Sequence, residues 1–493
     1  MKSKIDDINK QFYCLCQHLE DLTTKKKWNE ALDLLSVIAE GYYTYNQVYR
    51  DNFLEKGLMV LSEKLKEQVR SIPLAEKESR DVLFYDGFES SGNDYRGLVY
   101  VYLKALCEAG YRIVYVIPRQ KEKGVPNIKA LLQNYHGEIR CFSSGNSTVA
   151  FRELWAICCK YKVKYSFLYT TPWDVIGLAV FNGLKGQTQR YLINLTDHAF
   201  WLGVNALDYC LEFREYGASI SANYRGLQKN QLIMQPYYPI VDGHIKFEGF
   251  PFQVKEDDFV LFSGGSLYKT LGAGGTFYRI VDSCLQKYSN LKFWYAGSGD
   301  DTEMRKLIRK YPGRAVLTEE RPDLLALLQH VDLYLNTYPI SGGLMLQYAA
   351  LARRLPLTLV HDEDAKGLLL HQDTLGIYFY DKDSFLKELY QLIENKKYRR
   401  EKESHLAGAV ISADDFRDNL ICILETGKSR FPIQMGKVDT DGMRQNCLEN
   451  FDAEKTIPRL VATKRHYRLL FTLPTLFLRG GLSKIFLKLR KRF

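Results

Sequence analysis

Short apolar segments alternate with helical segments over most of the chain, and this alternation limits the possible folds more than any other sequence feature. In the first half, the segments typical of strands are 81–86, 112–117, 138–142, 165–169 and 190–194. The intervals between them have helical periodicity, as in 98–109, which ends before Gly110. Strands that alternate with helices pair in parallel, because each crossover helix returns the chain to the same edge of the sheet. The sequence therefore predicts a parallel sheet with helices on both faces.

The same pattern restarts after a segment rich in Pro, Gly and Tyr at 235–252. Strands are expected there at 259–263, 291–296, 314–317, 332–336 and 356–360, and helices at 275–288, 302–310, 321–330 and 343–353. A segment without periodicity between two such patterns is typical of a hinge. We therefore predict an α/β chain with two Rossmann-like domains that face a cleft, where ligands bind at the carboxyl ends of the strands.

The two ends of the chain lack this alternation. Apolar residues recur at helical spacing near the N-terminus, through Ile5, Ile8, Phe12 and Cys16. The expected division is a helical N-terminal module at 1–75, Rossmann-like domains at 76–240 and 241–425, and a linker with a basic amphipathic tail at 426–493.

The net charge of +10 is concentrated in the tail. From Lys455 to the end the chain has eleven basic residues and no acidic residue, so the rest of the protein is close to neutral. A basic surface that coats nucleic acid over the whole protein is therefore excluded, and no nucleic-acid partner is expected.

The end of the tail has the pattern of a helix that lies in a membrane interface. One helical face carries apolar residues and the other carries basic residues: Leu482, Ile485, Phe486 and Leu489 against Lys484, Lys488, Lys491 and Arg492. Such a helix binds an anionic membrane surface through both faces. The alternative is a basic disordered end.

Other features indicate where the protein works. Residues 1–7 lack the apolar region of a secretory signal, and the apolar run 469–478 is about half as long as a membrane-crossing helix. The ten cysteines are scattered, without the spacing of a disulfide scaffold or a zinc site. We expect a cytoplasmic protein that lies on the inner face of the cytoplasmic membrane and contains no metal.

The strongest local motif is a strand, loop and helix at 333–356. The strand ends at Asn336, the loop contains Ser341, Gly342 and Gly343, and the helix begins there. Unpaired N–H groups and the positive end of the helix dipole would hold a pyrophosphate. The alternative is that the glycines only permit a tight turn.

This motif resembles the donor-binding segment of GT-B glycosyltransferases. The segment Phe-Ser-Gly-Gly-Ser-Leu-Tyr-Lys at 262–269 is similar to a Leu-Tyr-Lys stretch of the O-linked N-acetylglucosamine transferases, whose lysine binds the donor diphosphate. The resemblance implies that Lys269, preceded by Gly264 and Gly265, neutralises charge on the departing nucleotide.

The resemblance extends to a possible nucleobase site and to the first domain. It implies base contacts from Arg321 and the Glu319 backbone within Thr-Glu-Glu-Arg-Pro-Asp at 318–323. The loop Ser-Gly-Asn-Asp at 91–94 resembles the family's Gly-Asn-His loop, with Asp94 in place of the cleft-facing histidine. The segment 194–203, which contains His198, resembles a segment of bacterial surface-polysaccharide transferases.

Asp94 and His198 are the two candidates for the catalytic base on the acceptor side, because a carboxylate or an imidazole can accept the proton of an acceptor hydroxyl. Each also has a structural interpretation: an aspartate in a Gly-rich loop often forms a turn, and a histidine beside aromatic residues often packs. Phe200 and Trp201 could stack on a sugar or fill the core.

The sequence also departs from the family pattern. Many GT-B enzymes have a Glu-Ala pair on the donor helix, whose glutamate binds ribose, but Ala349 and Ala350 stand here. Gln347 is expected on a different helix face, and the family's threonine pair at the phosphate loop is missing. Because of these departures, the resemblance does not identify the nucleotide-sugar donor. They also keep open a non-catalytic GT-B-like protein that binds glycans or stabilises a transferase, or, as a weaker alternative, a sugar-nucleotide epimerase.

The function expected from the resemblance is a bacterial glycosyltransferase of the hexosyltransferase type, acting in polysaccharide biosynthesis. It would take a sugar from a nucleotide sugar, expected to be UDP-linked, and transfer it to a saccharide or lipid-linked acceptor. The nucleotide sugar is a co-substrate, and no separate cofactor is expected.

Overall fold

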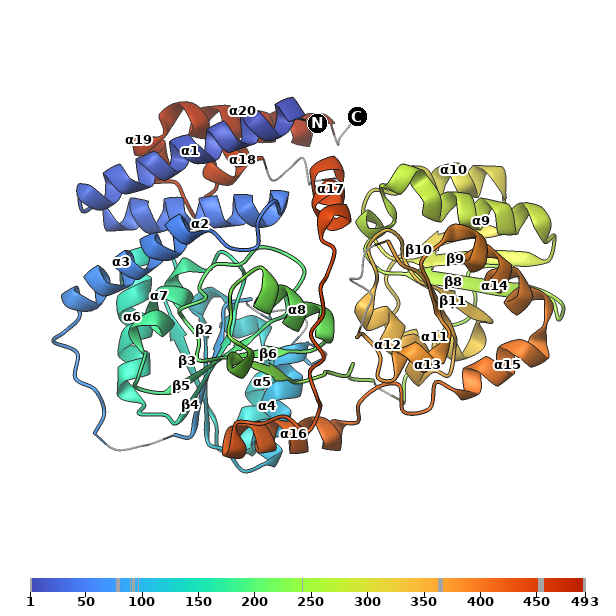
Figure 1. Cartoon of the computed structure of the whole chain (residues 1–493), viewed down its shortest axis with the longest axis horizontal. Helices are drawn as coiled ribbons and strands as arrows, with labels where there is room; N and C mark the ends of the chain where they lie inside the picture. Colours follow the sequence, from blue (N-terminus) through green and yellow to red (C-terminus); the bar gives the residue numbers. More distant parts are fainter. Residues whose placement is uncertain are drawn as a thin grey trace.

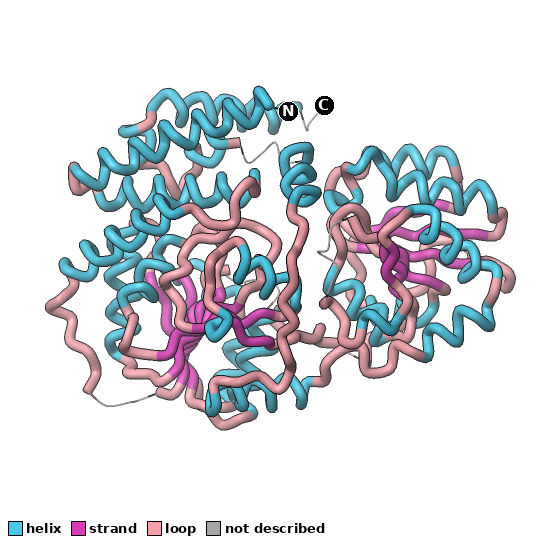
Figure 2. The backbone as a smooth tube through the Cα atoms, in the orientation of Figure 1, coloured by secondary structure: helices cyan, strands magenta, loops and turns pink. Residues whose placement is uncertain are grey.

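The computed structural model describes residues 2–76, 80–88, 90, 94–95, 97–241, 243–361, 367–450 and 456–490. It has two α/β halves, with further helices stacked over the half that contains the N-terminal part of the chain (Figure 1). The strands form two separate sheets, drawn in magenta in Figure 2. Two parallel sheets with interleaved helices confirm the predicted α/β fold with two Rossmann-like domains.

The first sheet has seven parallel strands in the order β3-β2-β1-β4-β5-β6-β7. Its strands are β1 (Val82–Asp86), β2 (Ile113–Pro118), β3 (Glu138–Phe142), β4 (Tyr165–Tyr169), β5 (Gln189–Ile193), β6 (Tyr209–Glu212) and β7 (Leu232–Met234). Its helical segments are α4 (Leu98–Glu108), η1 (Arg119–Gly124), α5 (Pro126–Asn134), α6 (Ser147–Lys160), α7 (Val175–Gly183), α8 (Glu215–Asn223) and η2 (Lys229–Gln231). The five strands predicted here are present, whereas the short β6 and β7 were not predicted.

The second sheet has six parallel strands in the order β10-β9-β8-β11-β12-β13. Its strands are β8 (Phe259–Gly264), β9 (Leu291–Ala296), β10 (Ala315–Thr318), β11 (Leu333–Leu335), β12 (Pro356–Leu359) and β13 (Tyr378–Phe379). Its helical segments are η3 (Leu267–Thr270), η4 (Ala273–Gly275), α9 (Thr276–Lys287), α10 (Thr302–Lys310), α11 (Leu324–His330), α12 (Gly343–Leu351), α13 (Gln372–Leu375), α14 (Lys382–Glu394) and α15 (Lys396–Ser404). The predicted strands and helices of this half are all present.

Helix α16 (Ala413–Thr426) returns from the second half to the first and packs against α4. Its buried side chains, including Phe416 and Leu420, join the core on one face of the first sheet. The Tyr165 hydroxyl in β4 donates to the Leu424 carbonyl over 2.7 Å. This packing differs from the expected division, which assigned residues up to 425 to the second domain, because an amphipathic pattern does not say which sheet a helix covers.

The N-terminal helices α1 (Lys2–Thr24), α2 (Trp28–Tyr45) and α3 (Asn52–Gln68) pack together with α6 and α7 over the other face of the first sheet. They form the expected helical module, but this module is not separate. The Ser36 hydroxyl in α2 donates to the Trp173 carbonyl over 2.8 Å, and Glu55 in α3 accepts a hydrogen bond from the Gly203 N–H over 2.8 Å. Both partners lie in loops after strands of the first sheet, so the module covers part of its carboxyl edge.

The C-terminal segment contains α17 (Asp441–Asn450), α18 (Ile457–Val461), α19 (Leu469–Thr472) and α20 (Pro474–Arg490). Helices α18 and α19 contact α2, and Leu460 and Leu469 are buried in the shared core. Helix α20 crosses α18 so closely that a Cβ at Gly480 would lie 1.8 Å from the Pro458 carbonyl oxygen. The two described ends of the chain therefore pack in one helical layer (Figure 1).

This packing corrects one expectation about the tail. From the sequence, residues after about Lys455 were expected to add membrane affinity without contributing to the core of the body. Instead α18 and α19 supply core residues, while one face of α20 stays exposed: Leu482 is 59% exposed and Leu460 is 5% exposed. The tail therefore has one side that packs into the core and another, along α20, that faces solvent.

Two leucine substitutions should show that the buried side of the tail contributes to stability and the exposed side does not. Leu460→Ala should cost about 2–5 kcal/mol of unfolding free energy, because it leaves a cavity between α18 and α2. Leu482→Ala makes the same chemical change on the exposed face and should alter stability by about 0.5 kcal/mol or less. The urea midpoints of the two variants measure the difference. Equal midpoints would show that α18 does not contribute to the folded core.

Candidate functional site

Two loops of the second domain meet at the carboxyl edge of its sheet. One follows β8 and leads into η3, which contains Lys269; the other follows β11 and leads into α12. The loops are neighbours because β8 and β11 pair in register, with Leu261 opposite Leu333. The Ile340 N–H donates to the Lys269 carbonyl over 3.3 Å. The structure thus brings together the lysine and the glycine loop that the sequence analysis singled out separately.

Asn336 organises the loop before α12. Its side chain is 2% exposed, and its Oδ1 accepts hydrogen bonds from the Thr337 N–H at 2.9 Å and the Gly342 N–H at 3.0 Å. The Gly342 N–H is therefore paired, which corrects the expectation that it is open to a ligand. Helix α12 begins at Gly343, where a Cβ would lie 2.8 Å from Leu368. Ser341 precedes this fixed turn.

The glycines after β8 allow a close passage of the backbone. Gly265 has a φ of +115°, a conformation that favours glycine. Its N–H donates to the Ala296 carbonyl over 2.9 Å, and a Cβ at Gly297 would lie 1.9 Å from the Gly265 oxygen. Gly264 is the last residue of β8 and pairs with Ala296. These two glycines therefore shape the turn that leads to Lys269.

In the region where nucleobase contacts were predicted, the Arg321 guanidinium is paired with a carboxylate of the same loop. Arg321 is held by Asp323, with Nε to Oδ1 at 2.7 Å and Nη2 to Oδ2 at 2.6 Å. Its Nη1 also donates to the Gly249 carbonyl over 3.3 Å, so it anchors the segment between the domains. Glu319 is exposed next to this cluster. The Arg321 guanidinium has structural partners, and the base contacts predicted for Arg321 and for the Glu319 backbone stay predictions.

Asp94 has the contacts of a helix cap. It is buried, and its Oδ2 accepts hydrogen bonds from the backbone N–H groups of Asn127 at 2.6 Å and Ile128 at 3.1 Å, in the first turn of α5. Its Oδ1 accepts from the Asn127 amide at 3.0 Å. Residues 91–93 of the predicted loop lie outside the described residues. Because Oδ2 caps α5 and Oδ1 is bound to the Asn127 side chain, the structure favours the capping role for Asp94 over the role of catalytic base.

His198 follows β5 and remains accessible, with its side chain 40% exposed. The loop around it is clamped by Asn46, the buried residue that ends α2. The Asn46 amide donates to the His198 carbonyl over 3.1 Å, and its Oδ1 accepts from the Phe200 N–H at 3.0 Å. Phe200 and Trp201 are buried in the core, which supports packing rather than sugar stacking for that pair.

Asp197 orients the His198 ring. The His198 Nδ1 lies 3.4 Å from Asp197 Oδ1, and the same oxygen accepts from Arg214 Nη2 at 2.9 Å. Burial alone would raise the pKa of Asp197, but the charge and hydrogen bonds of Arg214, with a smaller contribution from His198, lower it to about 2. Asp197 is therefore ionised at neutral pH. A carboxylate beside Nδ1 favours the tautomer in which Nε2 can accept a proton.

Two aromatic residues that sequence reasoning missed pack together at the carboxyl edge of the first sheet. The rings of Tyr43 in α2 and Trp173 after β4 lie 5.0 Å apart. The pKa of Tyr43 is raised to about 12, first by burial and then by the charge of Tyr268 in η3. Tyr268 itself is 56% exposed. Nothing local in the sequence indicates that α2 would reach this position.

Gln347 in α12 contacts backbone carbonyls from two other parts of the chain. Its amide donates to the Tyr237 carbonyl over 2.9 Å and to the Leu368 carbonyl over 3.3 Å, so it ties the second domain to the first. It borders a cavity of about 310 Å³ between the domains, which Arg214 and Tyr237 also line. Gln347 is a connecting residue at the hinge.

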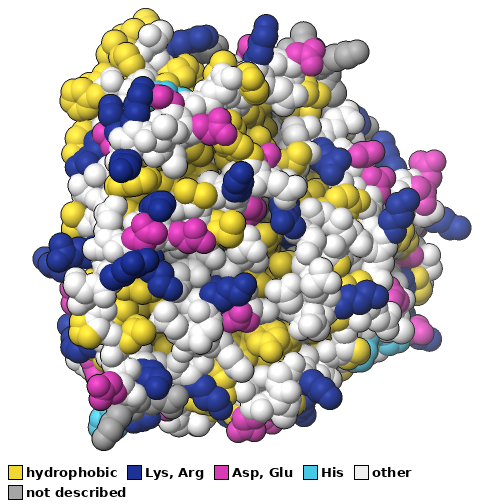
Figure 3. All heavy atoms as spheres, turned by 60° about the vertical axis from the view of Figure 1, so that its left-hand side comes forward, with side chains coloured by type: hydrophobic (Ala, Val, Ile, Leu, Met, Phe, Trp, Pro, Cys, Tyr) yellow, Lys and Arg dark blue, Asp and Glu magenta, His cyan; other side chains and the backbone are white. Residues whose placement is uncertain are grey.

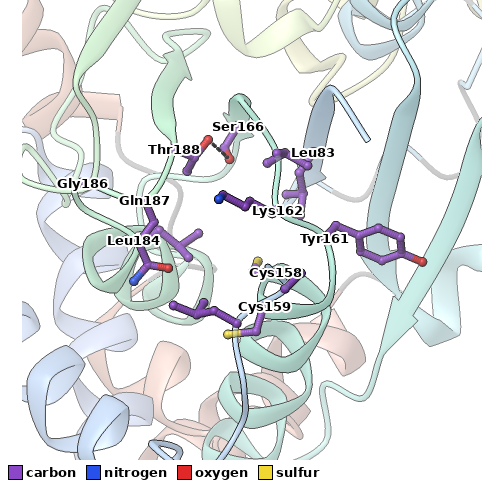
Figure 4. Close-up of a pocket in the computed structure, with 13 residues that line it drawn as sticks. Leu83, Cys158, Cys159, Tyr161, Lys162, Ser166, Leu184, Gly186, Gln187 and Thr188 are labelled. Carbon is purple, nitrogen blue, oxygen red and sulfur yellow. Dashed lines mark hydrogen bonds between the residues drawn. The ribbon is translucent and has the colours of Figure 1, made fainter. Parts of the chain in front are cut away.

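A second cavity, of about 270 Å³, lies at the opposite edge of the first sheet (Figure 4). It is lined by residues near the amino ends of β1 and β4, including Leu83 and Ser166, and by Cys158 and Cys159 of α6. Burial raises the pKa of the Cys159 thiol to about 11, so it is not a reactive thiolate. In the described part of the chain, no group of three or more His, Cys, Asp or Glu side chains is arranged to hold a metal ion.

The Asp197 and Arg214 pair should dominate the stability of the region around His198. Asp197→Ala should cost about 3–5 kcal/mol, because Arg214 would keep a buried charge without its partner. A second change, Arg214→Met, should recover part of this loss. The lowered pKa means that the stabilisation is fully present above about pH 4 and is lost as the pH falls through 2.

Urea unfolding of the wild type and the Asp197→Ala variant at several pH values measures this contribution. The two stabilities should differ most near neutral pH and converge toward pH 2. A difference that does not depend on pH would contradict a role for the ionised Asp197 carboxylate.

We compared the chain with known protein families, sequences and structures. No protein-family model matches the chain, and no curated protein sequence matches it. The structure of a mutant O-GlcNAc transferase from Thermobaculum terrenum superposes with a TM-score of 0.54 and 14% identity, over 90% of this chain and 81% of that one. A putative UDP-N-acetylglucosamine 2-epimerase from Listeria monocytogenes has a TM-score of 0.47 and 11% identity, over 74% of this chain and all of that one. S. aureus MnaA with UDP has a TM-score of 0.45 and 13% identity, over 72% and 100%. The superposition on the O-GlcNAc transferase, together with the two parallel sheets, shows that the chain has the fold of GT-B glycosyltransferases, with two Rossmann-like domains.

Proposed function

We propose that this protein is a glycosyltransferase that transfers a sugar from a nucleotide sugar, UDP-linked in our proposal, to a saccharide acceptor. The observation that carries the proposal is the meeting of the Lys269 loop with the Ser341 to Gly343 loop at the carboxyl edge of the second sheet. A cation beside a helix N-terminus is suited to a diphosphate. The O-GlcNAc transferase with the same fold is consistent with this chemistry.

In this proposal the bond between the sugar and the nucleotide diphosphate breaks as the acceptor oxygen attacks the sugar. Lys269 and the start of α12 take up the negative charge that develops on the departing diphosphate. No divalent metal takes part, because the lysine supplies the positive charge. The hydrogen bonds of Asn336 hold the α12 loop in place before the donor binds.

His198 is the proposed base, and it accepts the proton of the acceptor hydroxyl. Asp197 holds its ring and Asn46 holds its backbone, so the base is positioned before the acceptor enters. The partly exposed Tyr43 and Trp173, whose rings pack against each other, are the proposed surface on which a saccharide stacks. With the departing nucleotide bound in the second domain, the acceptor would lie on the first-domain side of the cleft.

The proposed acceptor is lipid-linked, and the proposed location is the cytoplasmic face of the membrane in a bacterium. The most exposed large apolar side chains of the described residues lie in α19 and α20, where Phe471 is 79% and Phe486 is 70% exposed. Apolar side chains also gather at the upper left of the face shown in Figure 3. None of the described helices meets the length and hydropathy that a membrane crossing requires. We propose that α20 lies on an anionic membrane surface.

A second candidate is a non-catalytic GT-B-like protein that binds glycans or stabilises a transferase. It is favoured by one observation: Ala349 and Ala350, where many enzymes carry the ribose-binding pair, are buried and have no polar side-chain group. Such a protein would bind a nucleotide or glycan without turnover.

Replacing Lys269 tests the proposed donor site. Lys269→Ala should weaken UDP binding about 10- to 100-fold, a loss of about 1.4–2.7 kcal/mol, because the diphosphate loses a charged partner. Lys382→Ala removes an exposed lysine at the start of α14 and should leave the affinity unchanged. Titration calorimetry with UDP measures both variants. Equal affinities for the wild type and the Lys269 variant would reject the proposed site.

A panel of nucleotide sugars separates the two candidate functions. Transfer or hydrolysis by the wild type that is abolished in Lys269→Ala supports the glycosyltransferase. Nucleotide binding without any turnover, measured across donors and with lipid-linked and soluble acceptors, supports the non-catalytic protein.

Metal removal tests the proposed mechanism. Turnover of the best donor should be the same in excess chelator as in buffer with magnesium or manganese, because Lys269 and a helix N-terminus would carry the charge of the leaving group. Loss of turnover in chelator that is restored by added metal would contradict the metal-independent mechanism. Product formation followed by chromatography provides the measurement.

A further inference from the structure

A groove opens between α18 and α20 on the solvent side of the tail. It has a volume of about 570 Å³ and is lined by Arg459, Arg479, Leu482, Ser483, Phe486 and Leu487. Its lining combines two guanidinium groups and one hydroxyl with three large apolar side chains. A lining of this kind suits a ligand that is anionic at one end and apolar at the other.

The groove is built by contacts within the folded protein. The crossing at Gly480 brings α20 against Pro458 of α18. The Arg459 Nε donates to the Ser483 hydroxyl over 2.9 Å, and the Lys484 Nζ donates to the Ala462 carbonyl over 2.9 Å. These bonds join the two helices along the groove. Since α18 is anchored in the core with α2, the groove is a formed surface rather than a free helix face.

The charges at the groove fit a phosphate group. From Lys455 to the end of the chain there is no acidic residue, so the groove lies in a strongly basic segment. Arg479 is exposed, and Arg459 is partly exposed beside the Ser483 hydroxyl. A guanidinium group binds phosphate oxygens through two parallel hydrogen bonds, which a lysine cannot do.

The apolar part of the groove continues into an exposed apolar stripe along α20. Leu482 is 59% exposed and Phe486 is 70% exposed, and Leu478, Ile485 and Leu489 extend the same surface. A free phosphate or a nucleotide would leave these side chains in water. A lipid acyl chain would cover them.

We propose that this groove binds the headgroup phosphate of an anionic phospholipid, with the acyl chains against Leu482 and Phe486. The site deepens the membrane association proposed above, because it selects a headgroup and does not depend on diffuse charge alone. A symmetric pairing of two copies through this face is disfavoured, since it would bring two sets of arginines together. The continuous apolar stripe also argues against an RNA ligand.

Vesicle binding by the full-length protein tests the site. The probes are vesicles of phosphatidylglycerol with phosphatidylcholine and vesicles of phosphatidylcholine alone. The groove variant is Arg459→Gln with Arg479→Gln, and the control is Lys464→Gln with Arg468→Gln, which removes the same charge from the same tail. The groove variant should lose at least tenfold more affinity for the anionic vesicles than the control does. Equal losses would show diffuse attraction and overturn the site.

Further measurements separate the lipid from other occupants. Inorganic phosphate at millimolar concentration should release no more protein from anionic vesicles than sodium chloride does at the same ionic strength. Release by phosphate alone would show a free-anion site and overturn the lipid assignment. Sedimentation without lipid should give the same mass for the wild type and the groove variant. Unchanged vesicle binding together with lost self-association in the variant would assign the face to a second copy.

Two controls keep the result interpretable. Arg479→Gln alone changes an exposed side chain that no described fold contact requires, so it should fold like the wild type and lose part of the vesicle affinity. The groove variants should bind UDP like the wild type, because none of these residues belongs to the proposed donor site. A groove variant that loses vesicle binding but still binds UDP supports the lipid groove, whether or not the proposed transfer reaction is correct. A wild-type protein that does not bind UDP would reject the proposed function and leave the groove proposal standing.

Discussion

The burial of α2 is the interaction on which the rest of the structure depends. This helix contacts α1, α3, α6, α7, α17, α18 and α19, and its residues from Ala31 to Ala39 are all buried. A helix that is covered on every side must pair its polar groups inside the protein. The Asp33 carboxylate accepts a hydrogen bond from the Ser147 hydroxyl over 2.6 Å, and the Ser36 hydroxyl donates to the Trp173 carbonyl. These bonds set the helix in one position across the first sheet.

The position of α2 connects the two ends of the chain with the candidate site. Its last turn carries Tyr43, and Asn46 follows it and clamps the His198 loop on both sides. On its other side α2 packs against α18 and α19, which carry the α20 groove. A protein that acts on a membrane-bound acceptor needs its binding site held at a set orientation to the lipid surface. The shared core around α2 supplies a rigid connection between the proposed acceptor side and the proposed lipid groove.

Much of the fold could be predicted because local pattern and tertiary structure agree in the central strands and helices. The segments 138–142, 165–169, 291–296 and 302–310 were predicted with the bounds that the structure has for β3, β4, β9 and α10. The short β6 and β7 were missed because three or four residues carry too little alternation to indicate a strand. In the candidate site, Lys269 and the Gly343 loop were predicted from their motifs, and their proximity follows from the pairing of β8 and β11. The capping role of Asp94 was not predicted, because its partners lie more than thirty residues away in the chain.

The sequence by itself determined the two α/β halves, the hinge between them and the amphipathic character of the tail, because periodicity and composition are local properties. Only the tertiary structure decided that α16 belongs to the first sheet, that α18 and α19 complete the core of the N-terminal helices, and that α2 covers the carboxyl edge next to His198. The physical reason is that an apolar helix face must be buried, but its pattern does not specify the surface that buries it. That choice depends on shape and on single polar pairs between distant residues, such as Asn46 with the His198 loop.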